Sequence, residues 1–426
     1  MVDKNKVIAD LGLITETTLG QDLFNPIHIR YKAVLDHDID EELFKKAWEK
    51  VKRVYPIVDA VLGLESGDVG FYMDPAVREK HSKDHAYLVE PESGRNDPVK
   101  SRAPIEPGCE LVGGRLICVS FYERTVTIST YHALVDGGGL NTIFTAFLYE
   151  YLVLYTGHED EAPVVDLTEG RDIGDYYQGA TLDYVFSQEY TPVPLYTLPL
   201  GCTGFRDDDM VKDNDGVVSG TLNVPVKEFI KLCKENGANP SSMMCTLLAK
   251  AAYALNPEVQ DDIVFDLTVS VRNILGIEKT VANSVGLAVA YTTRDDITNR
   301  TVAEISQKIR RDVDIQRTKD HYISFRRLFY TYKHAPSYKA RTVTYIGALN
   351  VGDNNRHIVD LDLGTNSLYN LYMMQLNDKF IITLQHGKAT EKYMNELVKL
   401  FSEHGIKAEV KHSAHYLAQD SRTQVL

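Results

Sequence analysis

The 426-residue sequence lacks any long apolar run, any excess of basic residues and any C-x-x-C pair. Without eighteen or more consecutive apolar residues, no helix is expected to span a membrane. The stretch "MVDKNKVIADLGLITETTLG" contains no apolar segment followed by a small-residue cleavage site, so we expect a cytoplasmic protein without a secretion signal. The 46 basic and 60 acidic residues give a formal charge of −14, which argues against a nucleic-acid partner because phosphates require a positive surface.

Motifs for bound groups are missing as well. The glycines at 137–139 are not followed by G-K-[ST], and no G-x-G-x-x-G opens a strand-helix unit, so no nucleotide site is predicted. The acidic stretch "RDDDMVKDND" at 206–215 lacks the terminal glutamate of a calcium loop, and we interpret it as a solvated linker. Reduced thiols, rather than disulfides or a zinc site, are expected of the five cysteines, Cys109, Cys118, Cys202, Cys233 and Cys245. No metal and no permanently bound cofactor is predicted.

The chain length and its patterns indicate two lobes. A chain of this size exceeds one compact core, and 44% hydrophobic with 25% charged residues is typical of a globular protein. Residues 27–34 alternate as a half-buried strand, and Asp40 caps a helix that Pro56 ends. The second half begins alike, with the strand "SGTLNVP" and the helix "VKEFIKLCKENG". We therefore predict an α/β fold of two similar lobes, 1–210 and 211–426.

Further elements follow from local patterns. A weak strand is predicted at 57–63, and a hairpin of "LICVSFY" and "TVTISTY" turns at Glu123-Arg124. Residues 156–216 lose periodicity and are interpreted as a long crossover. In the strand "FDLTVSVR", Arg272 is predicted to lie on the polar face with Asp266, Thr268 and Ser270. Later strands are expected near 342–346, 368–375 and 379–385, then a helix from about 390 to Gly405, and a surface tail that carries His412 and His415.

The stretch "TISTYHALVDGGGLNTIFTAFLYEYL" at 127–152 differs from ordinary core sequence. A strand leads directly into His132, Asp136 follows four positions later, and three glycines open a helix with apolar residues at helical spacing. His132 has the strand parity of Val126 and Ile128, so we expect its ring to leave from the apolar-leaning face.

Partial burial at that position would suit a general base. It favours the neutral imidazole, which leaves one ring nitrogen able to take a proton. The glycines allow another molecule to approach the backbone closely, and the helix N-terminus favours developing negative charge. The alternative is a structural turn, with a core histidine, an aspartate that caps the helix and glycines that make a tight bend. Spacing alone leaves both interpretations open.

At this point the sequence resembles the chloramphenicol-acetyltransferase-like superfamily. That superfamily includes peptide-synthetase condensation domains, plant acyltransferases with an H-x-x-x-D motif, and stand-alone bacterial alcohol acetyltransferase-like proteins, to which this stretch is most similar. The motif that matches is His132-Ala133-Leu134-Val135-Asp136-Gly137. Weaker matches extend over most of the chain: "YPIVDAVL", "DLTVSVRN", "NSVG" and "TYIGAL".

The resemblance implies an acyltransferase with two lobes around a central tunnel. His132 would deprotonate a hydroxyl or amine of a small acceptor, which attacks the thioester of acyl-CoA or of an acyl-phosphopantetheine carrier protein. Gly137 belongs to the same motif. Asp136 would be structural and pair with an arginine, for which Arg272 is the candidate, although its spacing also suggests direct orientation of His132. Thr344 is the candidate for stabilising the oxyanion, and the protein is expected to act as a monomer.

Two departures from the superfamily narrow the expectation. Tyr131 stands where condensation domains carry a first histidine, which weakens a role in peptide condensation, and no plant-type D-F-G-W-G occurs. Two alternatives to an acyltransferase remain: a catalytically silent member of the fold that binds a carrier protein or assembly partner, and an unrelated protein in which His132 is structural. The presence of His132, Asp136, Gly137 and Arg272 together favours the enzyme over the silent member.

Overall fold

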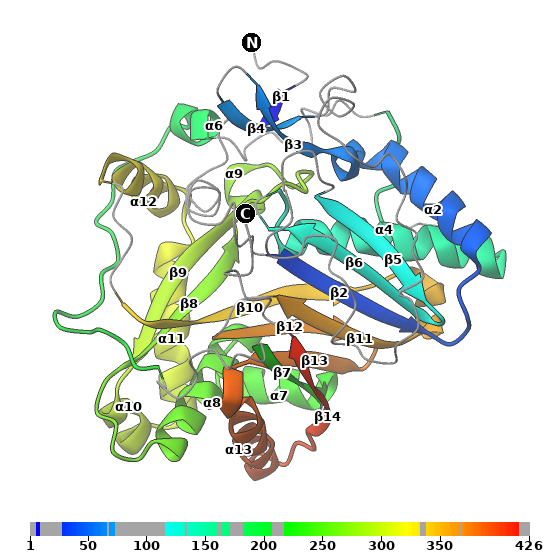
Figure 1. Cartoon of the computed structure of the whole chain (residues 1–426). Helices are drawn as coiled ribbons and strands as arrows, with labels where there is room; N and C mark the ends of the chain where they lie inside the picture. The colour runs from blue at the N-terminus through cyan, green and yellow to red at the C-terminus, as the bar shows by residue number, and fades with distance from the viewer. Residues whose placement is uncertain are drawn as a thin grey trace, which may run out of the picture.

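The computed structural model describes residues 6–8, 28–65, 68–72, 116–132, 134–160, 164–170, 182–206, 217–332, 338–365 and 369–416. Within these ranges the chain forms two main sheets, each with its own hydrophobic core (Figure 1). The first sheet has four strands in the order β11 (Ile358–Thr365), β2 (His28–Leu35), β6 (Thr125–Tyr131) and β5 (Ile117–Tyr122). A small third sheet contains β1 (Lys6–Ile8), β4 (Asp68–Tyr72) and β3 (Val61–Glu65).

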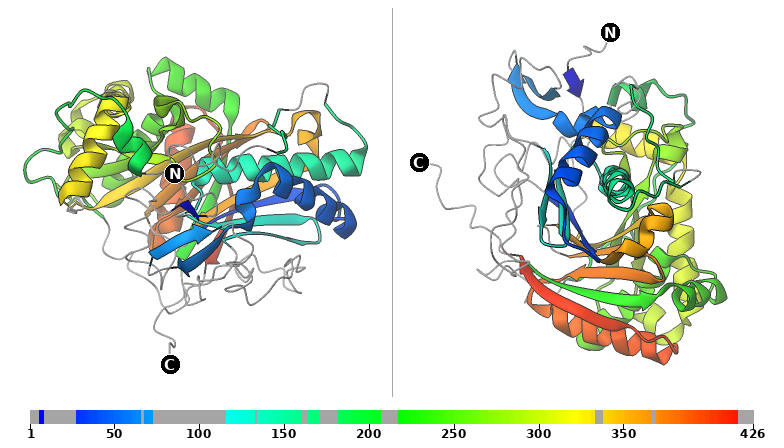
Figure 2. Two further views of the ribbon diagram at one scale, coloured as in Figure 1. Left: turned by 90° about the horizontal axis from the view of Figure 1, so that it is seen from above. Right: turned by 90° about the vertical axis from the view of Figure 1, so that its right-hand side faces the viewer.

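Two helices cover one face of the first sheet. Helix α2 (Glu41–Val54) begins where the Asp40 side chain accepts a hydrogen bond from Leu43 N, and it buries Phe44 and Trp48 as the periodicity predicts. Helix α4 (Gly137–Thr156) is buried along most of its length and ends at Gly157, whose φ is +68°. The right-hand view of Figure 2 shows α4 almost end-on beside this sheet. Both predicted helices are confirmed, and so is the hairpin turn at Glu123.

The second sheet has seven strands, and a layer of helices packs on its far face. Its strands, in order, are β14 (Glu409–Tyr416), β7 (Val217–Pro225), β13 (Lys379–Gln385), β12 (Asn370–Leu376), β10 (Ala340–Leu349), β8 (Ile263–Ser270) and β9 (Val285–Thr292). The packed helices are α7 (Val226–Glu235), α8 (Pro240–Leu255), α11 (Val302–Gln316) and α13 (Thr390–Glu403). Met374 and Ile381 of this sheet instead belong to the core of the first sheet, so the two sheets share a buried boundary.

Strand β11 joins the two halves of the chain. The chain leaves β10 of the seven-stranded sheet, passes through the 3-10 helix η3 (Gly352–His357), and enters β11, which pairs antiparallel with β2. It then returns to the seven-stranded sheet as β12. This strand was not predicted from the sequence. The lobe boundary predicted near residue 210 lies in 207–216, outside the described residues.

Three local predictions are wrong. Residues Pro56–Asp59 form the 3-10 helix η1, so the strand predicted at 57–63 begins only at Val61. Strand β8 ends at Ser270, and Arg272 is the first residue of the short helix α9 (Arg272–Leu275) rather than part of the polar strand face. His412 and His415 lie in β14, because pairing with β7 extends a segment whose side chains give no strand pattern.

Shorter elements complete the described part of the chain: α6 (Leu182–Ser187), α10 (Arg294–Asn299), α12 (Lys319–Tyr332) and the 3-10 helix η4 (Gly387–Ala389). No helix among the described residues is long and apolar enough to cross a membrane.

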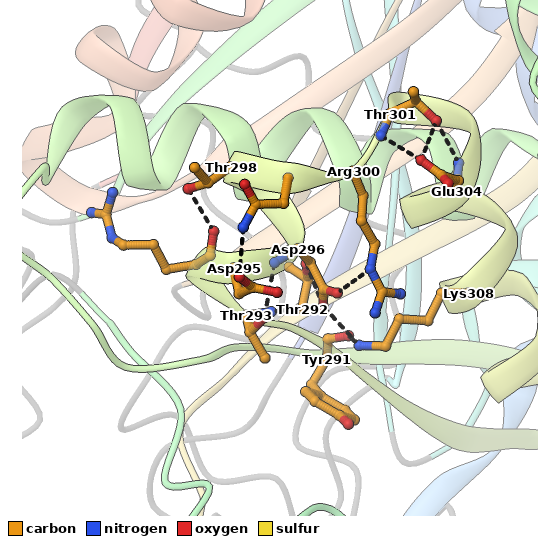
Figure 3. Close-up of polar contacts among 12 residues, drawn as sticks. Tyr291, Thr292, Thr293, Asp295, Asp296, Thr298, Arg300, Thr301, Glu304 and Lys308 are labelled. Atoms are coloured by element: carbon orange, nitrogen blue, oxygen red, sulfur yellow. Dashed lines mark hydrogen bonds and ion pairs between the residues drawn. The ribbon is translucent and has the colours of Figure 1, made fainter.

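A polar cluster fixes the corner where β9 turns into α10 and α11 (Figure 3). Asp296 is 3% exposed and accepts hydrogen bonds from Thr293 N and Lys308 Nζ, while Arg300 Nε lies 3.1 Å from its other oxygen. Burial raises the pKa of Asp296, but these hydrogen bonds and charges outweigh burial and hold the pKa below its usual value. A capping box formed by Thr301 and Glu304 starts α11 beside this cluster.

The side chain of Gln316 covers the outer edge of β9 by making the two backbone hydrogen bonds that a neighbouring strand would make. Gln316 Oε1 accepts from Val289 N at 2.9 Å, and Gln316 Nε2 donates to Val289 O at 2.6 Å. Lys308 Nζ donates to the backbone oxygen of Tyr291 further along the same edge. Unpaired edge strands invite association with other chains, so these contacts protect the sheet.

We expect Gln316→Leu to lower the free energy of unfolding by about 1–3 kcal/mol, because the Val289 N–H and C=O lose their partners while side-chain size is kept. Urea unfolding of the full chain measures this. The control is Gln260→Leu, since Gln260 is exposed and its side chain donates a weak hydrogen bond, 3.3 Å long, to Glu258 O. Equal losses in the two variants would mean that the edge contact contributes nothing specific.

Candidate active site

His132 lies directly after the central strand β6, in the turn that connects this strand to α4. Its side chain is half-buried, whereas Tyr131 before it and Leu134 after it are fully buried. Strand β6 pairs with β2 on one side and β5 on the other, so the base of the turn is rigid. The turn therefore presents a partly accessible imidazole on a fixed support.

A segment from the second half of the chain clamps this turn. Asn283 Nδ2 donates to His132 O at 2.9 Å, and Asn283 N donates to Leu134 O at 3.1 Å. Val135 forms an isolated antiparallel bridge with Ala282. The backbone on both sides of His132 is thus held by residues about 150 positions away along the sequence.

Asp136 is buried, with 4% of its surface exposed, and both carboxylate oxygens have partners. Oδ1 accepts from Gly139 N at 2.8 Å, which caps α4, and from Arg272 Nη2 at 2.9 Å. Oδ2 accepts from Ser284 N at 2.8 Å. Asp136 and Arg272 are therefore in direct contact as an ion pair, and neither oxygen is directed to the His132 ring.

Arg272 extends this network to the clamping segment. Its Nε donates to Thr280 O at 2.7 Å and its Nη2 donates to Ala282 O at 2.9 Å, in addition to its bond with Asp136. A guanidinium is planar and carries five donors, so one side chain can hold a carboxylate and two carbonyls together. The position of Arg272 at the start of α9, just past the strand end, is what lets it reach all three.

Close packing explains one of the three glycines that open α4. A Cβ on Gly139 would lie 1.9 Å from the carbonyl oxygen of Val281, so no other residue fits between α4 and the clamping segment. At Gly137 a Cβ would lie 2.9 Å from Tyr31 Oη, and Tyr31 Oη donates to Gly137 O at 2.9 Å. Burial raises the pKa of Tyr31, with further contributions from Asp136 and Tyr372, so this hydroxyl stays protonated.

The surroundings of His132 favour its neutral form. Burial lowers its pKa below the usual value, and this outweighs the opposite effects of the carbonyls of His132 and Val135 and of the Asp136 charge. Nδ1 is shielded from solvent without a hydrogen bond of normal geometry, so Nε2 is the ring nitrogen that an approaching molecule can reach. A neutral imidazole with an accessible nitrogen can accept a proton.

Thr344 lies in β10 next to Tyr372 of β12. Its strand neighbour Val343 faces the core of the seven-stranded sheet, so Thr344 points to the opposite face, on which Tyr372 packs against the first core. No hydrogen bond joins Thr344 to His132 among the described residues.

Three residues of this site were not predicted from the sequence: Tyr31, Asn283 and Ser284. The last two lie within "NSVG", which carried part of the resemblance, but no local pattern assigned them a contact with the turn. Tyr31 belongs to the ordinary alternation of β2, and nothing in its neighbourhood distinguishes it from a core tyrosine.

No protein-family model matches the sequence, and no curated protein matches it. Solved structures do match. F. sporotrichioides TRI101 complexed with coenzyme A and T-2 aligns with 94% of this chain and 99% of its own, at 12% identity and a TM-score of 0.58. Polyketide synthase associated protein 5 from Mycobacterium tuberculosis aligns with 92% of this chain and 97% of its own, at 12% identity and a TM-score of 0.57.

A condensation domain matches over the same extent. The starter condensation domain of rhizomide synthetase, in complex with C8-CoA and Leu-SNAC, aligns with 93% of both chains at 12% identity and a TM-score of 0.57. At such low identity the likeness shows the fold. The chain therefore shares the α/β fold of TRI101, of polyketide synthase associated protein 5 and of this condensation domain, in agreement with the two-lobed α/β fold that was predicted.

We expect Asp136→Asn to lower the free energy of unfolding by about 3–5 kcal/mol, because it leaves Arg272 as a buried charge without a counter-charge. Thermal and urea unfolding of the full chain measure the loss. Asp314→Asn is the matched control: its carboxylate is about half exposed and pairs with exposed arginines, so removing it should cost less than about 1 kcal/mol. A variant that unfolds like the parent but loses all turnover would instead favour a direct catalytic role for Asp136.

Proposed function

We propose that the protein is an acyltransferase that moves an acyl group from a thioester to a hydroxyl or amine, with His132 as the general base. The observation that carries the proposal is the clamped turn: a neutral, half-buried imidazole on a rigid support, whose neighbouring carboxylate is engaged elsewhere. The alternative of direct orientation by Asp136 finds no support, since Gly139, Arg272 and Ser284 occupy its oxygens.

The chemistry requires one proton transfer in each direction. The acceptor O–H or N–H gives its proton to His132 Nε2 while the oxygen or nitrogen attacks the thioester carbonyl carbon. The tetrahedral intermediate then expels the thiolate, which takes the proton back from the imidazolium, so acylated acceptor and free thiol leave. A base whose pKa lies near the working pH is needed, because a free hydroxyl is a poor nucleophile at neutral pH.

The solved relatives support a two-substrate site. TRI101 was crystallised with coenzyme A and T-2, and the rhizomide synthetase domain with C8-CoA and Leu-SNAC, so this fold accommodates a thioester carrier together with a second ligand. We propose acyl-CoA as the donor, with an acyl carrier protein as the other source of the same thioester. The acceptor is a small molecule with a nucleophilic hydroxyl or amine.

The site is proposed to lie in a tunnel between lobes 1–210 and 211–426. Its supporting observation is that the His132 turn comes from the first half of the chain, whereas Asn283 and Arg272, which hold it, come from the second. Thr344 remains the proposed oxyanion donor. The supporting observation is that a Cβ on Gly137 would lie 3.5 Å from Ile346 Cγ1, two residues further along the same strand, so β10 lies beside the turn.

Replacement of His132 tests the mechanism. We expect His132→Ala to reduce kcat/KM for thiol release from acyl-CoA by roughly 10²–10⁴-fold, the usual contribution of a positioned base. The control is His404→Ala, because His404 is exposed at the end of α13. Unchanged turnover in a folded His132→Ala variant would overturn the mechanism and favour a catalytically silent member of the fold that binds a partner.

The pH profile gives a second test. A general base acts in its neutral form, so kcat/KM should be constant at high pH and fall as the pH drops through the pKa of His132. Because burial lowers this pKa, the fall should be centred below pH ~6.5, the ordinary value for histidine. Initial rates of thiol release between pH 5 and 9, in buffers of constant ionic strength, locate the limb. An acidic limb centred well above that value would indicate a different base.

A further inference from the structure

We propose that Asp36, His37 and His357 form a binding site for a divalent transition metal, with Zn²⁺ as the ion that fits best. The three residues lie away from the His132 turn, at the junction where η3 meets the end of β2. Their ligand atoms all lie within 4.8 Å of one another. No sequence pattern indicates this site, because Asp36 and His357 are 321 positions apart.

The carboxylate of Asp36 lies between two imidazoles. His37 Nδ1 is 2.6 Å from Asp36 Oδ1, and His357 Nδ1 is 2.9 Å from Asp36 Oδ2. The histidines contribute through the same type of atom, and the two rings are nearly perpendicular, with centroids 6.1 Å apart. Two nitrogens and a carboxylate therefore converge on one small region.

The surrounding structure holds these ligands in place. Asp36 N donates to His357 O at 3.0 Å, which ties the two backbones together. The ring of His37 stacks on Tyr155 with 3.6 Å between centroids and 2° between planes. The His side chains are 11% and 19% exposed, whereas that of Asp36 is 43% exposed. An ion could enter from the carboxylate side and keep water on its remaining positions.

The donor set selects the class of metal. Two imidazole nitrogens and one carboxylate suit Zn²⁺ and its borderline neighbours, whereas Mg²⁺ and Ca²⁺ prefer oxygen ligands only. Three protein ligands with an open position is the coordination of accessible zinc sites. The second acid-rich group at the other end of η3, made of His158, Asp160 and Asp353, offers one imidazole and two carboxylates and fits this class less well.

Metal binding changes the protonation of the rings without changing their charge. In the metal-free state each Nδ1 donates its proton to Asp36, and Arg356 Nε donates to His357 Nε2 at 3.4 Å. Ligation moves each proton from Nδ1 to Nε2. The exposed Arg356 side chain can withdraw to allow this at His357. At His37 the proton would move to Nε2, which is buried and has no hydrogen-bond acceptor among the described residues. We therefore expect His357 and Asp36 to be the stronger ligands.

An ion at this position would join parts of the chain that are distant in sequence. His37 follows β2 of the first sheet, and His357 ends η3, which connects β10 of the second sheet to β11 of the first. The metal would therefore strengthen the attachment of the crossing segment. It lies outside the proposed catalytic turn, so the inference does not depend on the proposed function.

The test uses the full chain stripped with a chelator and then dialysed. Isothermal titration with ZnCl₂ should give one site, and excess Zn²⁺ should raise Tm, because a ligand that binds only the folded state stabilises it. Co²⁺ should give the visible absorption of a nitrogen-ligated ion.

Asp36→Asn and His357→Ala should each weaken Zn²⁺ binding by at least about tenfold, since even residues that only hydrogen-bond to a metal ligand contribute roughly 10–100-fold. Arg356→Gln should strengthen it.

The matched control is His158→Ala, which removes an exposed histidine at the opposite end of η3 and should leave Zn²⁺ binding unchanged. Circular dichroism confirms that each variant is folded before titration. The proposal is overturned if the stripped parent binds no Zn²⁺ in titration, or if His357→Ala and Asp36→Asn bind it as tightly as the parent. Loss of binding only in His158→Ala would assign the ion to the other end of η3.

Discussion

The buried charge of Asp136 is the constraint on which the proposed active site depends. A carboxylate out of contact with water requires a counter-charge and hydrogen bonds to both oxygens. Arg272 and the amides of Gly139 and Ser284 meet that requirement, and each brings its own segment to the turn. The close approach that makes glycine necessary at 139, and the contact of Asn283 with the backbone of His132, follow from the same assembly.

Local sequence patterns predicted the helices, caps and turns that are determined by residues close together in the sequence. The periodicity of α2 and α4, the cap at Asp40 and the hairpin at Glu123 depend on residues within a few positions of one another, and the structure agrees with each. Strand β11 was missed although residues 359–363, "VDLDL", alternate apolar and polar side chains, so a local signal was present. Strand β14, "EVKHSAHY", has no such alternation, and what makes it a strand is its pairing with β7, far away in the sequence.

The same distinction applies to the candidate site. The residues of the H-x-x-x-D-G motif could be found by spacing, and a resemblance supplied Arg272. Spacing alone could not decide whether Asp136 orients the His132 imidazole or stabilises the fold. The contact that decides it is the hydrogen bond from Ser284 N, a residue 148 positions away. Tyr31 and Asn283 were missed for the same reason: their importance comes from where the fold places them, since neither residue type is unusual in a strand or a loop.

The course of β11 has a consequence for how the chain is made. Strand β2 is finished when residue 35 leaves the ribosome, yet its neighbour on one side is not synthesised until residues 358–365. During most of translation the first sheet therefore has an open edge at β2, and unpaired edges of nascent sheets are prone to wrong pairing and aggregation. The first sheet therefore cannot complete its native strand pairing until residues 358–365 have been synthesised.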